Sequence, residues 1–135
     1  MMEREEYERI GKEIVDCCLS VHREMGPGLL ESVYEMSLMK EFELRGINAE
    51  CQVAVPLVYK GYELSKEFRI DILLENEIVL ELKATETVSP THIAQIISYL
   101  KLTDKRLGYL INFNVPLMKN GVQRFVNNYY KTIVI

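Results

Sequence analysis

Two apolar segments near the middle of the chain, FRIDILL (68–74) and IVLELKA (78–84), constrain the fold more than any other feature. Both are rich in β-branched and aliphatic residues, which favour β-strands. Only Glu75, Asn76 and Glu77 separate them, and a connection this short joins antiparallel neighbours. The two segments are therefore predicted to lie side by side in a β-sheet.

Charged residues interrupt both segments. In the second segment Glu81 and Lys83 are two positions apart, so both side chains point to one face of the strand. The other face of that strand is apolar and is expected to enter the core: Ile78, Leu80, Leu82 and Ala84. In the first segment four apolar residues are predicted to share one face of the strand: Phe68, Ile70, Ile72 and Leu74. Asp71 is predicted to point to the other face of the same strand. Charges in mid-strand are costly unless they are paired, solvated or bound to a metal.

The register of this hairpin decides whether the two carboxylates meet. With a three-residue loop, Leu74 pairs with Ile78 and Asp71 lies directly opposite Glu81. A two-residue loop would place the carboxylates on opposite faces and would also mismatch the apolar faces. The hydrophobic pattern therefore predicts that Asp71, Glu81 and Lys83 converge. Carboxylates this close repel each other, and a divalent cation is the usual way to keep both ionised.

The rest of the chain predicts helices before and after these strands. Apolar spacing indicates helices over 4–24 and 29–44, the second ending at Gly46, and Ser89-Pro90 is typical of the start of a third helix ending near residue 102. Strands are predicted over 51–59, 64–74, 77–84 and 107–113, with 120–126 as a candidate edge strand. The strand over 107–113 follows a helix, so we expect it to be buried and parallel to an earlier strand. The order ααβββαβ, with the candidate strand at its end, describes a single α/β domain over residues 1–135.

The segment GPGLLESVYE (26–35) joins the first two helices. Its Gly-Pro-Gly sequence ends one helix, and Glu31 follows in the first turn of the next. One interpretation of Glu31 is a carboxylate that the helix dipole favours. The other is a third carboxylate placed over the sheet beside Asp71 and Glu81.

Taken together, these motifs resemble the PD-(D/E)XK nuclease superfamily. Asp71-x9-Glu81-Leu82-Lys83 is similar to its core signature, and Gln95-x3-Tyr99 on the third helix is similar to the RecB-like branch. Upstream, the sequence GLLESVY (28–34) resembles the motif that names the GxxExxY protein family. The resemblance extends over nearly the whole chain and implies a restriction-endonuclease-like core, with a mixed sheet flanked by helices.

The resemblance also implies a role for each residue that matches the pattern. Asp71 and Glu81 would bind Mg²⁺ or Mn²⁺ together with the backbone carbonyl of Leu82. Lys83 would be the catalytic lysine, and Glu31 would be an additional carboxylate at the metal.

Further residues of the pattern would support this centre. Gln95 and Tyr99 would orient the site or contact the substrate backbone. For Tyr34, three residues after Glu31, we weigh a place in the core against a hydrogen bond to Glu31 and favour the role of supporting Glu31. The proline that the superfamily usually has before its first aspartate is replaced by Ile70.

Composition limits the setting but does not identify a function. The net charge is −4 and the pI is about 5.3, which does not favour non-specific nucleic-acid binding, although a metal in an acidic pocket can attract a phosphate. Three cysteines, Cys17, Cys18 and Cys51, have no disulfide framework and suit a reducing cytoplasm. We expect a cytoplasmic protein with no membrane association.

The expected activity is metal-dependent hydrolysis of phosphodiester bonds in nucleic acid, and we expect the substrate to be DNA rather than RNA. One alternative is a nuclease-fold subunit that binds nucleic acid or protein without independent catalysis, and another is hydrolysis of a small nucleotide. The simplest structural alternative for Glu81 and Lys83 is a surface salt bridge. The apolar first helix and C-terminal tail are also compatible with a homodimer or a larger protein complex.

Overall fold

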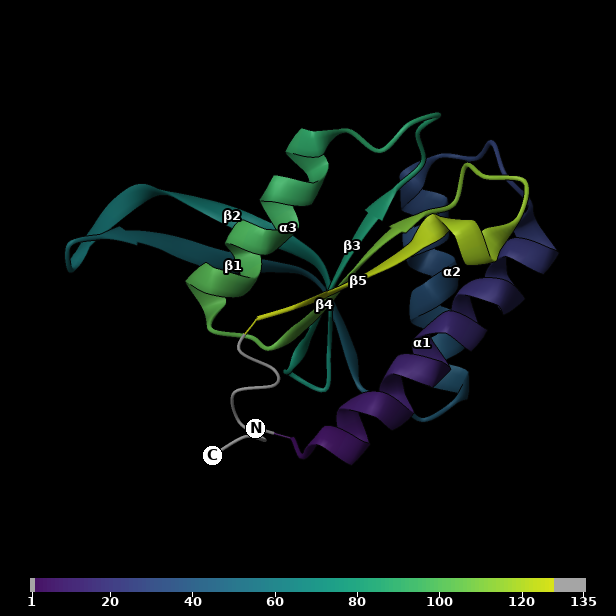
Figure 1. Ribbon diagram of the computed structural model, residues 1–135, viewed down its shortest axis with the longest axis horizontal. Coiled ribbons are helices and arrows are strands. Elements are labelled where there is room, and N and C mark those ends of the chain that lie inside the picture. Colours follow the sequence, from purple (N-terminus) through teal and green to yellow (C-terminus); the bar gives the residue numbers. More distant parts are fainter. Residues whose placement is uncertain (1, 128–135) are drawn as a thin grey trace.

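The computed structural model describes residues 2–127, which form a mixed five-stranded sheet with helices on both faces (Figure 1). The elements follow the predicted order: α1 (Arg4–Met25), α2 (Glu31–Leu44), β1 (Ala49–Tyr59), β2 (Tyr62–Leu74), β3 (Ile78–Lys83), α3 (Pro90–Thr103), β4 (Leu107–Asn112), the short 3₁₀ helix η1 (Met118–Gly121) and β5 (Val122–Val126). The candidate edge strand is therefore confirmed as β5. The C-terminal tail cited for a homodimer lies outside the described residues from position 128 onward.

The strands lie in the order β1-β2-β3-β4-β5. β3 and β4 are parallel, as predicted, because α3 carries the chain across one face of the sheet between them. The other neighbours are antiparallel. Every residue of β4 is buried, which confirms the expectation of a strand covered on both faces.

Two apolar clusters fill the space between the sheet and its helices. The larger one packs α1 and α2 against one face and includes buried aromatic side chains: Tyr7, Tyr34, Phe42 and Phe113. The smaller one lies beneath α3 and contains Ile70, Leu73, Val79 and Leu100. No helix among residues 2–127 is long and apolar enough to cross a membrane.

The side-chain alternation of β2 differs from the prediction. Ile72 and Leu74 pack in the cluster beneath α1 and α2, whereas Phe68 and Ile70 pack in the cluster beneath α3. The prediction that these four residues share one face is therefore wrong. The reversal occurs between Ile70 and Ile72, opposite Gln52, whose φ of 54° departs from the extended backbone of a regular strand.

The outer part of the β1–β2 hairpin, residues 56–67, extends away from the sheet as an arm (Figure 1). β2 pairs with β3 only through Ile72, Leu73 and Leu74, so the arm is supported by β1–β2 pairing alone. Its tip exposes Tyr59 and Tyr62, which are 61% and 76% exposed.

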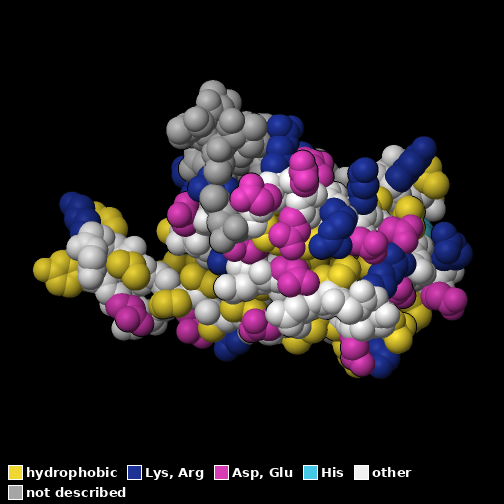
Figure 2. Space-filling view, turned by 90° about the horizontal axis from the view of Figure 1, so that it is seen from below, with side chains coloured by type: hydrophobic (Ala, Val, Ile, Leu, Met, Phe, Trp, Pro, Cys, Tyr) yellow, Lys and Arg dark blue, Asp and Glu magenta, His cyan; other side chains and the backbone are white. Residues whose placement is uncertain are grey.

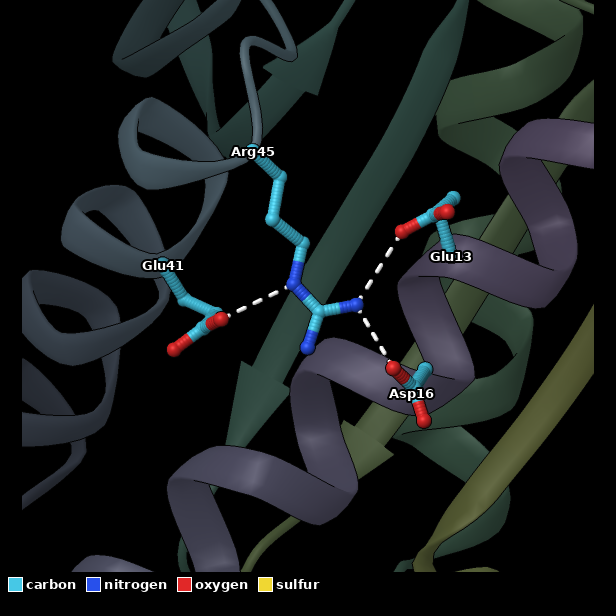
Figure 3. A network of polar contacts seen from close by, with 4 residues as sticks. All are labelled: Glu13, Asp16, Glu41 and Arg45. Atoms are coloured by element: carbon cyan, nitrogen blue, oxygen red, sulfur yellow. Dashed lines mark hydrogen bonds and ion pairs between the residues drawn. The ribbon is translucent and has the colours of Figure 1, made fainter.

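Arg45 joins the first two helices to each other (Figure 3). Its Nη1 donates to Glu13 Oε2 at 3.0 Å and to Asp16 Oδ2 at 2.6 Å on α1, while its Nε donates to Glu41 Oε2 at 2.8 Å on α2. The next residue, Gly46, follows the end of α2 with a φ of 71°, the left-handed conformation that suits a helix-terminating glycine. The α1–α2 pair is thus held by one half-buried guanidinium as well as by its apolar face.

Replacing Arg45 with methionine is expected to lower the free energy of unfolding by about 1–3 kcal/mol, because three carboxylates lose their shared partner. Thermal unfolding should show a fall in Tm of roughly 3–10 °C. Arg9→Met is the matched control, since Arg9 makes one exposed contact with Glu6 at 3.9 Å. Equal melting of the two variants would contradict a clamping role for Arg45.

Candidate active site

The site lies where β2 and β3 stop pairing. The ladder runs from Leu74–Ile78 to Ile72–Leu80, the register that the three-residue turn predicts. Beyond it, side chains take over the hydrogen bonding between the strands. Asp71 Oδ2 accepts from the backbone N–H of Leu82 at 2.7 Å, and Glu81 Oε1 accepts from the backbone N–H of Asp71 at 3.4 Å. The structure therefore brings Asp71 and Glu81 together in the opening between the strands.

Glu81 is held in an environment that disfavours its charge. Glu81 is only 4% exposed, and this burial is the main reason that its pKa is raised from 4.5 to about 9. Repulsion from Asp71 and a side-chain hydrogen bond with it raise the pKa further, while Lys83 opposes the shift. A buried carboxyl in this position needs either a proton or a nearby cation.

Lys83 and Glu31 interact electrostatically with this pair of carboxylates. Lys83 is half-buried at the end of β3, and Glu31 is the first residue of α2. Desolvation and the charge of Asp71 raise the pKa of Glu31, and the charge of Lys83 opposes that increase. Electrostatic interaction thus connects Glu31 with Asp71 and Lys83.

Tyr34 bonds to the turn before α2 and not to Glu31. Its hydroxyl donates to the carbonyl of Gly26 at 2.5 Å and accepts from the N–H of Leu29 at 3.1 Å. Its fully buried ring stacks on Phe113, with 4.4 Å between the ring centroids. The predicted support of Glu31 is therefore indirect, because Tyr34 fixes the turn from which the Glu31-bearing helix starts.

Helix α3 presents Gln95 and Tyr99 to the opening from the other face of the sheet. Tyr99 stacks on Phe68 at 4.0 Å between centroids and has a side-chain hydrogen bond with Gln95. Burial and the charges of Glu81 and Asp71 raise the pKa of Tyr99, so this hydroxyl lies within electrostatic range of both carboxylates.

The helix α3 starts at Ser89, whose N–H donates to His92 Nδ1 at 3.2 Å. His92 is thus a capping residue of α3.

Three residues at the site were not predicted from the sequence: Gln52, Glu35 and Asn112. The Gln52 side chain contacts both Asp71 and Glu35, and nothing in its local sequence distinguishes it from a surface residue of a strand.

Asn112 anchors the chain just after Lys83. It is 4% exposed, and its side chain bonds the backbone N–H and C=O of Thr85 at 3.1 and 2.9 Å. A polar residue that ends the buried strand LGYLIN was the signal in the sequence that could have revealed it.

The donor set fits a hard divalent cation through two protein carboxylates. Among residues 2–127, no group of three or more His, Cys, Asp and Glu side chains is arranged to hold a metal ion. Asp71 and Glu81 nevertheless form a close pair whose mutual repulsion a cation would relieve. Mg²⁺ commonly binds one or two protein carboxylates and retains several waters, which matches this pair.

The chain resembles known proteins at the level of a family. A family model described as the PD-(D/E)XK nuclease superfamily matches residues 8–125. The sequence matches no curated protein. Among solved structures, the crystal structure of SSO0001 is 21% identical with a TM-score of 0.47, and the match covers 90% of this chain and 59% of that one. The chain thus spans less than two thirds of that protein's length. From the family match along most of its length, the chain belongs to the PD-(D/E)XK nuclease superfamily.

Proposed function

We propose that this protein is a metal-dependent nuclease that hydrolyses phosphodiester bonds in DNA, and that it belongs to the GxxExxY family within the RecB-like branch. The superfamily supports nuclease activity and nucleic acid as the substrate class. The observation that carries the proposal is the buried Glu81 facing Asp71 where the β2–β3 ladder opens, with Lys83 beside them. Its three free cysteines suit a cytoplasmic location.

Asp71, Glu81 and the backbone carbonyl of Leu82 would hold Mg²⁺ or Mn²⁺. The N–H of Leu82 points to Asp71, and the N–H and C=O of one strand residue point to the same side, so the carbonyl faces the same opening. When bound, the metal supplies positive charge that polarises a phosphate and makes a bound water more acidic. Glu31 would add a further carboxylate from α2.

The remaining residues act on the substrate and on the attacking water. The Lys83 ammonium donates hydrogen bonds to the water or to a phosphate oxygen, where negative charge develops during the reaction. Gln95 and Tyr99 supply neutral donors from α3 that can orient the phosphate backbone. Asn112 holds the chain after Lys83 and thereby limits the movement of this lysine.

Cleavage of single-stranded, duplex and branched DNA and of RNA in Mn²⁺ and in EDTA tests the proposal. We expect Mn²⁺-dependent cleavage by the wild type and a loss of at least about 10²-fold in Asp71→Ala, since even residues that only support metal ligands contribute 10–100-fold. Glu50→Ala is the matched control, because Glu50 is an exposed β1 carboxylate. Equal activity of wild type and Asp71→Ala would contradict the site.

A nuclease-fold binding subunit without independent catalysis is the second candidate function, and the arm favours it. Figure 2 shows hydrophobic, basic and acidic side chains on the part of the molecule that projects furthest from the body, at the left. Tyr59 and Tyr62 are largely exposed there, and Lys60 Nζ lies 5.4 Å from the ring centroid of Tyr59. Such a surface suits nucleic-acid bases or another protein chain. Tight binding in EDTA without cleavage in any metal would favour this function over the enzyme.

A further inference from the structure

Gln52 has an unusual backbone conformation directly across the hairpin from Asp71. It lies between the pairs Cys51–Ile72 and Val53–Ile70, and its φ is 54°. Residues with a side chain rarely adopt this left-handed conformation inside a strand. Its carbonyl accepts from Arg69 Nη1 at 3.2 Å, so a side chain of the neighbouring strand contacts this peptide.

The side chain of Gln52 connects two carboxylates. Its Nε2 donates to Glu35 Oε1 at 2.6 Å and to Asp71 Oδ1 at 3.5 Å. The other oxygen of Asp71, Oδ2, accepts from the N–H of Leu82 at 2.7 Å. Donors on two different strands therefore hold the Asp71 carboxylate at both oxygens.

Glu35 lies one helical turn after Glu31 in α2. The Glu35–Gln52–Asp71 contacts thus connect the helix that bears Glu31 to the strand that bears Asp71. A neutral amide suits this place, because a lysine would compete with a cation for Asp71 and a glutamate would add repulsion. Because both Glu35 and Asp71 are acceptors, the NH₂ group of the Gln52 amide, and not its oxygen, faces Asp71.

We propose that Gln52, oriented by Glu35, is a positioning residue that sets the Asp71 carboxylate for binding a divalent cation. The inference rests on the proposed function, since it assigns Asp71 to the metal. The left-handed backbone is what allows the amide to reach across the hairpin to Asp71. Groups that orient metal ligands typically contribute 10–100-fold to metal affinity.

The test separates the amide from the backbone by measuring Mn²⁺ binding calorimetrically and Tm in EDTA. Gln52→Ala and Gln52→Gly both remove the amide, but glycine adopts a positive φ without strain. We expect both variants to bind Mn²⁺ about tenfold more weakly than the wild type, and Gln52→Gly to melt at a higher temperature than Gln52→Ala. Gln123→Ala, an exposed glutamine of β5, should bind as the wild type does.

Glu35→Ala tests the contact between Glu35 and Gln52. It should weaken Mn²⁺ binding in the same direction as Gln52→Ala, and the double variant should lose less than the product of the two single losses, because both act through one contact. Wild-type affinity in both Gln52→Ala and Gln52→Gly would overturn the proposal. So would recovery of affinity in Gln52→Gly alone, which would assign the effect to the backbone.

The outcomes also separate this inference from the proposed function. If the wild type cleaves DNA and the Gln52 variants bind Mn²⁺ as the wild type does, the positioning role of Gln52 is rejected and the proposed nuclease function stands. A wild type that binds Mn²⁺, with weaker binding in the Asp71 and Gln52 variants, but that cleaves no nucleic acid rejects the nuclease and supports the positioning role of Gln52. A wild type that binds no Mn²⁺ rejects both.

Discussion

Replacing Lys83 with alanine is expected to lower metal-dependent phosphodiester cleavage by about 10²–10³-fold, the loss typical of removing one donor that stabilises developing charge. Lys83 lies at the end of β3, and its charge acts on both Glu81 and Glu31. No other residue of the proposed set supplies a positive charge. The loss should appear mainly in kcat, because the lysine interacts most strongly with charge that develops during the reaction.

Metal binding should respond differently to the same substitution. Removing a cation beside two carboxylates does not weaken their attraction for Mn²⁺, so Lys83→Ala should bind Mn²⁺ at least as tightly as the wild type. Lys12→Ala is the matched control, since Lys12 is an exposed lysine of α1. A Lys83→Ala enzyme with wild-type kcat would remove Lys83 from the reaction, whereas a parallel loss of Mn²⁺ binding would indicate a structural role instead.

Replacing Glu81 with glutamine is expected to have opposite effects on metal-free stability and on metal binding. The folded protein raises the pKa of Glu81 to about 9 from 4.5, so folding favours the protonated form. The resulting stabilisation is present below pH 4.5 and is lost as the pH rises through about 9. In EDTA, wild-type stability should therefore fall between these values, because Glu81 ionises in the unfolded chain while the folded protein keeps it protonated up to about pH 9.

An amide in place of the Glu81 carboxyl cannot cause such a loss, since an amide does not ionise. In EDTA at pH 8, Glu81→Gln should accordingly be more stable than the wild type by several kcal/mol, measured by urea unfolding. Saturating Mn²⁺ should stabilise the wild type but not this variant, because only the wild type keeps the second carboxylate ligand. Glu63→Gln, at an exposed position of the arm, is the control and should leave the pH profile unchanged. An unaltered profile in Glu81→Gln would show that Glu81 does not cause the pH dependence.

Much of the fold followed from local patterns. The period-two alternation of IVLELKA and the three-residue connection before it were enough to predict the Leu74–Ile78 register, and the helix before β4 was enough to predict its parallel placement. Ser89 and Gly46 marked helix ends for reasons that depend only on neighbouring residues. These features could be predicted because few residues, all close in sequence, determine them.

Other features depended on contacts between distant segments. Of the two roles weighed for Tyr34, its ring takes the place in the core, where it stacks on Phe113, and its hydroxyl bonds the preceding turn and not Glu31. The apolar face expected for β2 changes sides between Ile70 and Ile72, opposite the left-handed Gln52, and Ile70 packs in the cluster beneath α3. Alternation within one strand does not reveal that a helix later in the chain will cover its other face.

The sequence by itself determined that Asp71 and Glu81 meet, because turn length and hydrophobic alternation permit one register for their strands. Only the tertiary structure decided how they meet. The β2–β3 ladder ends at Asp71, whose carboxylate accepts hydrogen bonds from the N–H of Leu82 and from the side-chain amide of Gln52. The same amide donates to Glu35 of α2. The physical reason is that register is a property of adjacent segments, whereas burial, ladder opening and the reach of a left-handed Gln52 arise when α2, α3 and the hairpin pack together.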